Sequence, residues 1–335
     1  MMKKFKYFLF FAFWLSLNSC QDDDLSKCII TEPDCLTKSG EPVINFDSIV
    51  DFTQCIHSHD FVPLHRYEYI NPVFNPSNTN EIIYLRNEYS ETGGYLKKEL
   101  LKYNFCSNET SYITDLALYG IDWSSKDWII YTGYDQNLYK VKSNGDSLTQ
   151  LTTNGQFNGH AKWNDSGTQY LYRQEGIGGL LIAEERGGIL DTLDGLLVSQ
   201  WSWDNDRIFF TGGTFDNRSR IGEYDLINKE MIVIDSTLTR ILGAIKYNES
   251  VNELVFLFGN QVFAFHNLMT NQVDQRIIGY DNRTYNSFDL SSDGKTIVCS
   301  RSNLTQVDAC TIEVERFLHL IDISGDNERV LSIPE

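Results

Sequence analysis

Residues 123–155 read WSSKDWIIYTGYDQNLYKVKSNGDSLTQLTTNG, and this stretch decides the fold. Short runs of aromatic and β-branched residues alternate in it with Ser, Asn, Asp and Gly, which is typical of strands separated by turns. Asn144-Gly145 suits a type I′ hairpin, because both central residues of that turn need a positive φ. The stretch therefore predicts four short antiparallel strands.

A similar unit recurs six times along the chain. Each unit begins with a large apolar residue, continues with a small polar turn and leads into a second β-rich run. These anchor residues, 38–49 positions apart, are Phe74, Trp123, Trp163, Trp201, Tyr247 and Leu290. A four-stranded sheet cannot bury both of its faces alone, whereas sheets stacked around an axis cover one another. The repeat thus predicts an all-β fold, a six-bladed β-propeller of four-stranded antiparallel blades over residues 43–335.

The repeat also carries a family resemblance. Its order is an aromatic residue, Ser, a turn, an apolar strand, Leu-Tyr at 138–139, Leu-Thr at 151–152 and Gly155. This order resembles the WD40-like repeat of TolB-type propellers, most clearly over residues 123–155 and less closely over 163–195. The resemblance implies the fold and, by analogy, a partner that is another envelope protein or a cell-surface polymer. It does not imply an activity, since this scaffold carries binders, protease domains and lyases.

The first nineteen residues are predicted to be a signal peptide. Lys3, Lys4 and Lys6 precede an uncharged, mostly apolar run over residues 7–17. A spanning helix needs about 20 apolar residues, so this run is too short to be one. The following Leu-Asn-Ser-Cys at 17–20 resembles the lipobox of bacterial lipoproteins, which implies that Cys20 is acylated, as with palmitate. The alternative is an ordinary signal peptide followed by an unrelated cysteine.

Residues 20–42 are predicted to form an acidic, cysteine-containing tether. Gln21-Asp22-Asp23-Asp24 resembles the surface-export signal of some outer-membrane lipoproteins, and a solvated tether is the alternative. The expected location is therefore the outer membrane, lipid-anchored, facing the cell surface or the periplasm. Residues 43–64, ahead of the first repeat, are expected to add an outer strand to a blade or to plug one mouth of the propeller.

The charge of the chain excludes some partners. It has 28 basic and 46 acidic residues and a formal net charge of −18. Nucleic acid requires a basic face, so it is excluded as a partner. Acyl chains anchor a protein by burying methylene groups, so the folded part needs no membrane-binding surface of its own. We expect a monomer outside its complex.

The cysteines predict three disulfides in an exported protein. Setting aside Cys20, the six candidates are Cys28, Cys35, Cys55, Cys106, Cys299 and Cys310. Closeness in sequence favours Cys28–Cys35 and Cys299–Cys310, which leaves Cys55–Cys106. No Cys-x-x-Cys pair is present, which disfavours a thiol redox site or a zinc knuckle.

Two apparent functional signals are interpreted as structural. Trp123, Trp163 and Trp201 could be stacking platforms for sugars, but their recurrence at one repeat position predicts buried blade anchors. His57 and His59 would share one face of a strand and, with His65, could hold a metal. No carboxylate partner is evident for them, so the sequence predicts no metal site, no cofactor and no catalytic residues.

A binding face is predicted at one mouth of the propeller, where the loops that join successive blades meet the loops between second and third strands. The candidate residues are Arg66, Tyr67, Arg86, Tyr119, Phe157, His160, Arg173, Arg240, Arg283, Tyr285 and Arg301. Arg and Tyr are favoured at binding hot spots, and Arg pairs bidentately with carboxylates. This patch would suit an acidic peptide or an anionic glycan. The alternative is that these arginines pair with acidic neighbours such as Glu88, Glu175 and Asp308.

Three functions follow from these features. The leading one is a non-catalytic envelope lipoprotein whose propeller face binds a protein partner or a surface glycan. The second is a glycan-active lyase or hydrolase, which predicts His or carboxylate side chains that converge on the axis. The third is a structural subunit of an outer-membrane complex, which predicts an exposed apolar patch.

Overall fold

The computed structural model of the protein describes residues 35–42, 60–194, 200–213, 219–235, 244–259, 261–278 and 283–334. Every element below belongs to one compact unit, residues 35–335. Within these described ranges, no helix has the length and apolar character needed to cross a bilayer.

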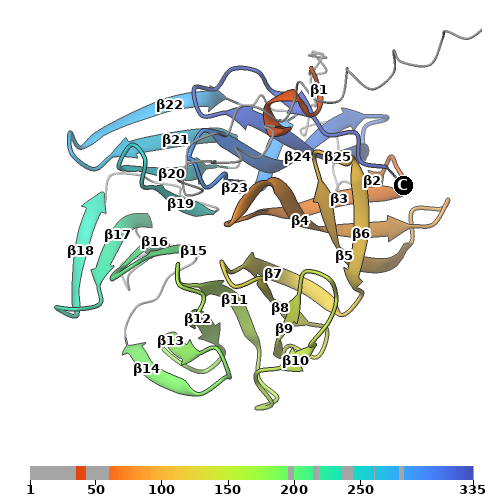
Figure 1. The fold of residues 1–335 in the computed structure, drawn as a ribbon. Helices are drawn as coiled ribbons and strands as arrows, with labels where there is room; N and C mark the ends of the chain where they lie inside the picture. The colour runs from red at the N-terminus through yellow and green to blue at the C-terminus, as the bar shows by residue number, and fades with distance from the viewer. Residues whose placement is uncertain are drawn as a thin grey trace, which may run out of the picture. The chain divides into compact units, whose positions relative to one another are not determined.

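Six blades, each built on four antiparallel strands, surround a central axis, which confirms the predicted six-bladed β-propeller (Figure 1). Blade 1 contains β3 (Tyr67–Asn75), β4 (Asn78–Tyr89), β5 (Tyr95–Asn104) and β6 (Glu109–Thr114). Blade 2 contains β7 (Ala117–Trp123), β8 (Trp128–Gly133), β9 (Leu138–Lys142) and β10 (Thr149–Gln150). Blade 3 contains β11 (Asn158–Trp163), β12 (Gln169–Gln174), β13 (Gly179–Glu184) and β14 (Ile189–Asp194).

The second half of the ring repeats this order. Blade 4 contains β15 (Gln200–Asp204), β16 (Arg207–Gly213), β17 (Ser219–Asp225) and β18 (Glu230–Asp235). Blade 5 contains β19 (Ile245–Asn248), β20 (Glu253–Phe258), β21 (Val262–Asn267) and β22 (Gln272–Ile278). Blade 6 contains β23 (Arg283–Leu290), β24 (Thr296–Gln306), β25 (Thr311–Asp322) and β26 (Arg329–Val330).

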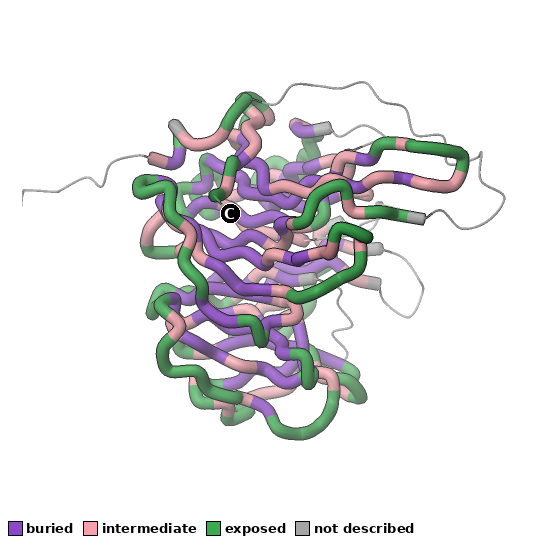
Figure 2. Tube along the Cα trace, turned by 90° about the vertical axis from the view of Figure 1, so that its right-hand side faces the viewer, coloured by how far each residue is buried: buried purple, intermediate pink, exposed green. Residues whose placement is uncertain are grey.

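Each blade buries its faces against its neighbours. Val73 and Leu85 of blade 1 pack with Trp123 of blade 2 in one apolar cluster. Leu320 of blade 6 packs with Tyr84 of blade 1 in another, so the last blade closes on the first. Figure 2 shows the buried residues along the middle of the stacked strands and the exposed residues at the hairpin tips. The core therefore lies between the sheets, as radial stacking requires.

The tryptophans at the repeat positions are buried, as predicted. Trp123, Trp163 and Trp201 all lie in apolar clusters between blades. The anchor of blade 4 is nevertheless Trp203 and not Trp201, because Trp203 pairs with Ile208 as Trp163 pairs with Tyr170. Residues two apart in a strand face the same side, so both tryptophans are buried and the sequence does not distinguish them.

Blade 6 carries two additional strands. β1 (Glu41–Pro42) pairs antiparallel with β26, and β2 (Asp60–Pro63) pairs parallel with β25. Between them, residues 43–59 lie outside the described part of the chain. Just before β1, the short 3₁₀ helix η2 (Leu36–Lys38) places Leu36 in the cluster between blades 6 and 1.

The predicted disulfides of Cys35 and Cys106 are wrong, because these two residues bond to each other across 71 positions. Asn80 explains their proximity. The backbone N–H of Cys35 donates to Asn80 Oδ1 (3.1 Å), and that of Phe105 donates to the Asn80 carbonyl oxygen (2.8 Å). Blade 1 therefore aligns the two segments. The predicted partners Cys28 and Cys55 lie outside the described residues.

The predicted Cys299–Cys310 disulfide is also wrong. Cys299 is a free thiol buried in blade 6, and burial raises its pKa well above the ordinary value. Cys310 does form a disulfide, but not with Cys299. Cys299 lies on β24, Cys310 lies in the turn just before β25, and the residue opposite Cys299 is His319. The hairpin therefore places them out of register.

Candidate functional site

Six inner-strand residues face one end of the central axis. Each directly precedes the blade anchor, and together we call them the mouth ring: Val73, Asp122, Lys162, Ser202, Lys246 and Asp289. All six line a single cavity of about 610 Å³. Because the repeat brings one position from every blade to the same end of the axis, residues about 40 positions apart become neighbours.

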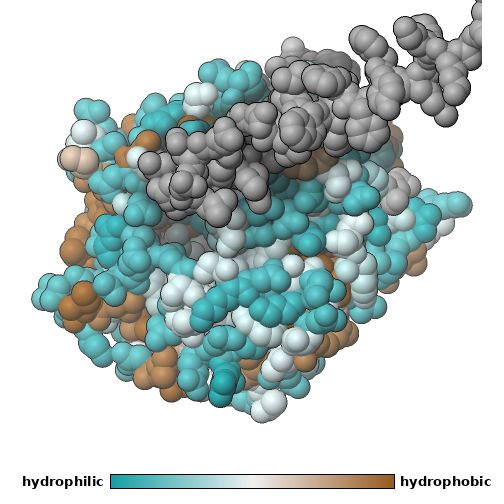
Figure 3. All heavy atoms as spheres, viewed as in Figure 1, coloured by the Kyte–Doolittle hydropathy of each residue, from teal (hydrophilic) through white to brown (hydrophobic). Residues whose placement is uncertain are grey.

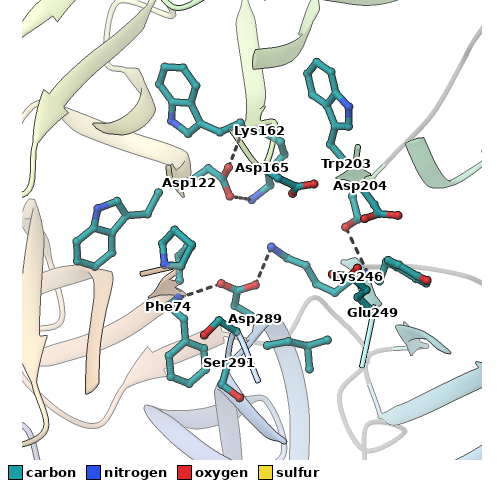
Figure 4. Close-up of a pocket in the computed structure, with 18 of the residues that line it drawn as sticks. Phe74, Asp122, Lys162, Asp165, Trp203, Asp204, Lys246, Glu249, Asp289 and Ser291 are labelled. Carbon is teal, nitrogen blue, oxygen red and sulfur yellow. Dashed lines mark hydrogen bonds and ion pairs between the residues drawn. The ribbon is translucent and has the colours of Figure 1, made fainter. Parts of the chain in front are cut away.

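The charges of the mouth ring are paired between adjacent blades. Lys162 Nζ lies 3.1 Å from Asp122 Oδ1, and Lys246 Nζ lies 2.6 Å from Asp289 Oδ1 (Figure 4). Burial opposes the charge of Lys246, but Asp289 and Asp122 outweigh it and raise the pKa of this ammonium group. Lys246 is therefore a cation at neutral pH.

The second oxygen of each ring aspartate holds the next blade. Asp122 Oδ2 accepts the backbone N–H of Trp163 (2.8 Å), and Asp289 Oδ2 accepts that of Phe74 (2.9 Å). The latter contact joins blade 6 to blade 1. Charge-assisted hydrogen bonds of this kind are stronger than neutral ones, so these two carboxylates stabilise the ring as well as line the cavity.

The outer wall of the cavity is acidic. Beyond the mouth ring it contains Asp165, Asp204, Glu249 and Asp293, so six carboxylates face two lysines. Asp204 is paired with Arg207 (2.6 Å), whereas Asp165 and Glu249 have no ion pair with any residue that the structure describes. Burial and the neighbouring Asp204 and Glu249 carboxylates raise the pKa of Asp165, opposed by the N–H of Asn205. The wall therefore favours a positively charged ligand.

Those predicted binding residues that the structure describes lie toward the opposite end of the blades from the cavity, and several arginines among them are already paired. Tyr67 begins β3, whereas Phe74 of the cavity lies near its end. Arg66 pairs with Glu88 (2.5 Å), and Arg86 pairs with Glu99 (2.7 Å). Both guanidinium groups also lie over the Tyr67 ring, at 5.3 and 4.5 Å from its centroid.

Arg301 is buried and forms an ion pair with Glu328. Arg173, at the same repeat position of blade 3, is exposed. Tyr285 is buried and packs edge-on against Phe263, with the ring centroids 4.9 Å apart. Arg240 and the side chain of Arg283 lie outside the described part of the structure. The arginines of blades 1, 3 and 6 thus have three different environments.

The structure brings one part of the predicted patch together. Phe157 stacks on Tyr119 with the ring centroids 5.6 Å apart, and the His160 ring is tilted against Tyr119 with its centroid also 5.6 Å away. Burial, with positive charge from Lys162 and Arg173, lowers the pKa of His160 to about 4. His160 is therefore neutral at neutral pH. This aromatic group is half-buried and also reaches Trp201.

Two tyrosines of this face, and the cavity on the opposite face, were not predicted from the sequence. Tyr95 and Tyr134 are exposed, come from the hairpins of blades 1 and 2, and join through their hydroxyls (2.8 Å). The mouth ring was visible in the sequence as a charged residue directly before the anchor in four of the six repeats. These residues are Asp122, Lys162, Lys246 and Asp289.

The histidines considered for a metal site are not gathered in the described structure. His57 and His59 lie outside the described residues, and His65 Nε2 lies 2.7 Å from Glu315 Oε1. Among the residues that the structure describes, no group of three or more His, Cys, Asp or Glu side chains is arranged to hold a metal ion.

Comparisons with known proteins identify the fold. No protein-family model and no curated protein matches the chain. A putative TolB from Agrobacterium tumefaciens is similar in structure, with a TM-score of 0.57, 14% identity, and coverage of 68% of this chain and 86% of that one. The β-propeller domain of the Trilobed protease from Pyrococcus furiosus is also similar, with a TM-score of 0.53, 11% identity, and coverage of 79% and 95%. These similarities confirm a TolB-like propeller fold.

Proposed function

We propose that the chain is a non-catalytic binding propeller that holds a basic segment of another envelope protein in the mouth cavity. The observation that carries this proposal is the excess of carboxylates in the cavity at one end of the central axis. The lysines of the cavity are neutralised by ring aspartates, and Asp165 and Glu249 remain for a ligand. Loops on a rigid scaffold of this kind are common binding sites.

The ring charges support binding over catalysis. Asp122 and Asp289 each hold a lysine and a backbone N–H of the next blade. A group that is fully engaged in this way has a structural task and is not poised to exchange a proton with a substrate. The acidic wall also favours a basic peptide over an anionic glycan, since like charges repel.

Removing two negative charges from the cavity is expected to weaken binding of a basic peptide. We expect Asp165→Asn combined with Glu249→Gln to weaken binding of a fluorescent octalysine peptide about tenfold at low salt, because 1.4 kcal/mol of lost attraction changes affinity tenfold. Fluorescence anisotropy on the full chain measures this. The wild-type affinity should fall as salt rises, since salt screens exposed charges.

A matched control changes the same number of charges elsewhere. Glu91→Gln combined with Asp146→Asn removes one Glu and one Asp at exposed positions that do not line the cavity. This variant should bind octalysine like the wild type. Equal weakening in both variants would mean that net charge, and not the cavity, attracts the peptide, and the proposal would be wrong.

We propose that acylation of Cys20 anchors the propeller to the outer membrane. The support is the apolar run and the Leu-Asn-Ser-Cys sequence before the acidic residues. The wild-type chain, expressed in a Gram-negative host, is expected to incorporate radiolabelled palmitate and to fractionate with the outer membrane. Cys20→Ser should lose both properties, and Ser19→Ala should keep both. Label retained by Cys20→Ser would contradict the anchor.

A further inference from the structure

The outer strands of the six blades differ at one register position. This position on the outer strand is defined by the residue that it pairs with on the third strand. In blades 1 to 6 that third-strand residue is Lys102, Lys140, Ile182, Glu223, Phe265 and Leu320. The outer-strand position is occupied by Ser111, Thr149, Asp191, Ile232, Asp274 and Arg329 in turn. Five blades place a polar or charged residue at their outer edge, and blade 4 places Ile232 there.

Ile232 belongs to an exposed apolar stretch of β18. Met231, Ile232 and Val233 expose 48%, 52% and 41% of their surface. Figure 1 places β18 at the left margin of the ring, and hydrophobic side chains appear at that margin in the space-filling view (Figure 3). Within the described residues, β18 pairs only with β17, so its other edge offers unpaired backbone groups. Native proteins usually protect such an edge with charge, so an apolar edge indicates a pairing surface.

Blade 6 shows that an outer edge of this propeller can accept a fifth strand. β1 pairs there with β26, and Pro42 stands opposite Arg329. Arg329 Nη1 in turn donates to the carbonyl oxygens of Thr37 and Ser39, both at 2.7 Å. The residue at the differing register position therefore helps to hold the added strand in blade 6.

We propose that β18 is a docking edge for an extended segment of a partner protein, with an apolar centre and basic flanks, which adds as a fifth strand to blade 4. Strand addition gains affinity from main-chain hydrogen bonds and specificity from alternate side chains. Met231 and Val233 would contact one face of the added strand, and Ile232 the other. This surface is on the rim of the propeller and is separate from the mouth cavity.

Charge determines which segment fits. Glu230 is exposed at the start of β18, and Glu223 is directly opposite Ile232 on β17. The only basic residue in the β17–β18 turn, Lys229, is paired with Asp191 of blade 3 (2.9 Å). Basic residues in the added strand would therefore meet unlike charge. Antiparallel pairing of β18 with β18 of a second copy, over its full length, would place Glu230 opposite Asp235, and like charges directly opposite each other disfavour self-pairing.

Adding a charge at the centre of the edge is expected to abolish strand addition. We expect a fluorescent peptide with two lysines on each side of Val-Thr-Val-Ile to bind the full chain and to protect the amides of residues 230–235 from hydrogen exchange. Ile232→Asp should weaken this binding at least tenfold, although its new negative charge attracts the lysines. The same peptide with glutamates in place of lysines should bind the wild type at least tenfold more weakly.

The matched control places the same charge at the same register position of blade 1. Ser111→Asp should bind the lysine-flanked peptide like the wild type. Unchanged binding by Ile232→Asp, or protection of amides outside blade 4, would overturn the proposal. A wild-type dimer in light scattering that Ile232→Asp converts to a monomer would also overturn it, because the edge would then serve self-association. Octalysine binding at the mouth cavity should be unaffected by Ile232→Asp, so the two proposals fail independently.

Discussion

Replacing Glu328 with Gln is expected to lower the free energy of unfolding by about 3–5 kcal/mol, the usual cost of removing one partner from a buried ion pair. Glu328 forms an ion pair with Arg301, whose side chain is only 2% exposed. His319 Nδ1 lies 3.0 Å from the same carboxylate and is equally buried. Burial lowers the pKa of His319, so this imidazole is neutral and cannot replace Glu328 as a counter-ion. The variant therefore leaves a buried guanidinium without its negative partner.

The same group predicts a pH dependence. Burial would raise the pKa of Glu328, but His319 and Arg301 outweigh it and lower the value from 4.5 to about 2. Because the folded-state pKa is depressed, the contribution of Glu328 is present above about pH 4.5 and is lost as the pH falls toward 2. The difference corresponds to about 3 kcal/mol at neutral pH. Wild-type stability should fall over this window more steeply than that of Glu328→Gln.

Urea unfolding at pH 7 and across pH 2–5 measures both effects. The control is Asp274→Asn, which removes an exposed carboxylate 3.1 Å from Arg276 and should cost less than about 1 kcal/mol. A second variant distinguishes the unpaired charge from a general loss of packing. Arg301→Met combined with Glu328→Leu removes both charges and should be more stable than Glu328→Gln alone. A loss below about 1 kcal/mol in Glu328→Gln would show that Arg301 does not depend on this carboxylate.

The fold was predictable from the sequence because its determinants are local and repeated. Residues 123–155 contain the turn residues, the period-2 strands and the anchor that define one blade, and six such units force radial stacking. The precise anchor of blade 4 was not predictable. Trp201 and Trp203 face the same side of β15 and are both buried, so only the pairing of Trp203 with Ile208 identifies the anchor.

The site was less predictable because its contacts join distant parts of the chain. In the alternative interpretation of the arginine patch, Arg86 pairs with a nearby acid such as Glu88, but its partner is Glu99 on the adjacent strand β5. Arg301 pairs with Glu328, 27 positions away, and not with Asp308. Strand register decides these pairs, and the sequence fixes register only where a buried face demands it.

The predicted disulfide pairs were wrong for a related reason. Pairing by nearness in sequence ignores that a propeller closes its ends together, so that Cys35 meets blade 1 and not Cys28. The closure of blade 6 on blade 1 brings residue 35 next to blade 1, which favours a long-range bond there.

Removing the Cys35–Cys106 disulfide is expected to cost about 4 kcal/mol of unfolding free energy. The bond spans 71 positions, and a loop of that length loses about 4 kcal/mol of chain entropy in the unfolded state when it is cross-linked. Cys35→Ser combined with Cys106→Ser removes the cross-link without leaving an unpaired thiol. Urea unfolding of the full chain under non-reducing conditions measures the change. Cys299→Ala, which removes a free thiol and no cross-link, is the control and should cost about 1 kcal/mol.

The competing explanation is that non-covalent contacts alone hold residues 35–42 in place. Leu36 is buried between blades 6 and 1, and Arg329 holds the carbonyl oxygens of residues 36, 37 and 39. These contacts act in the folded state, whereas the cross-link acts on the unfolded state. If they dominate, Arg329→Ala should destabilise the protein more than the double cysteine variant does. If the cross-link dominates, the double cysteine variant should be destabilised more than Arg329→Ala, although its Arg329 contacts are intact.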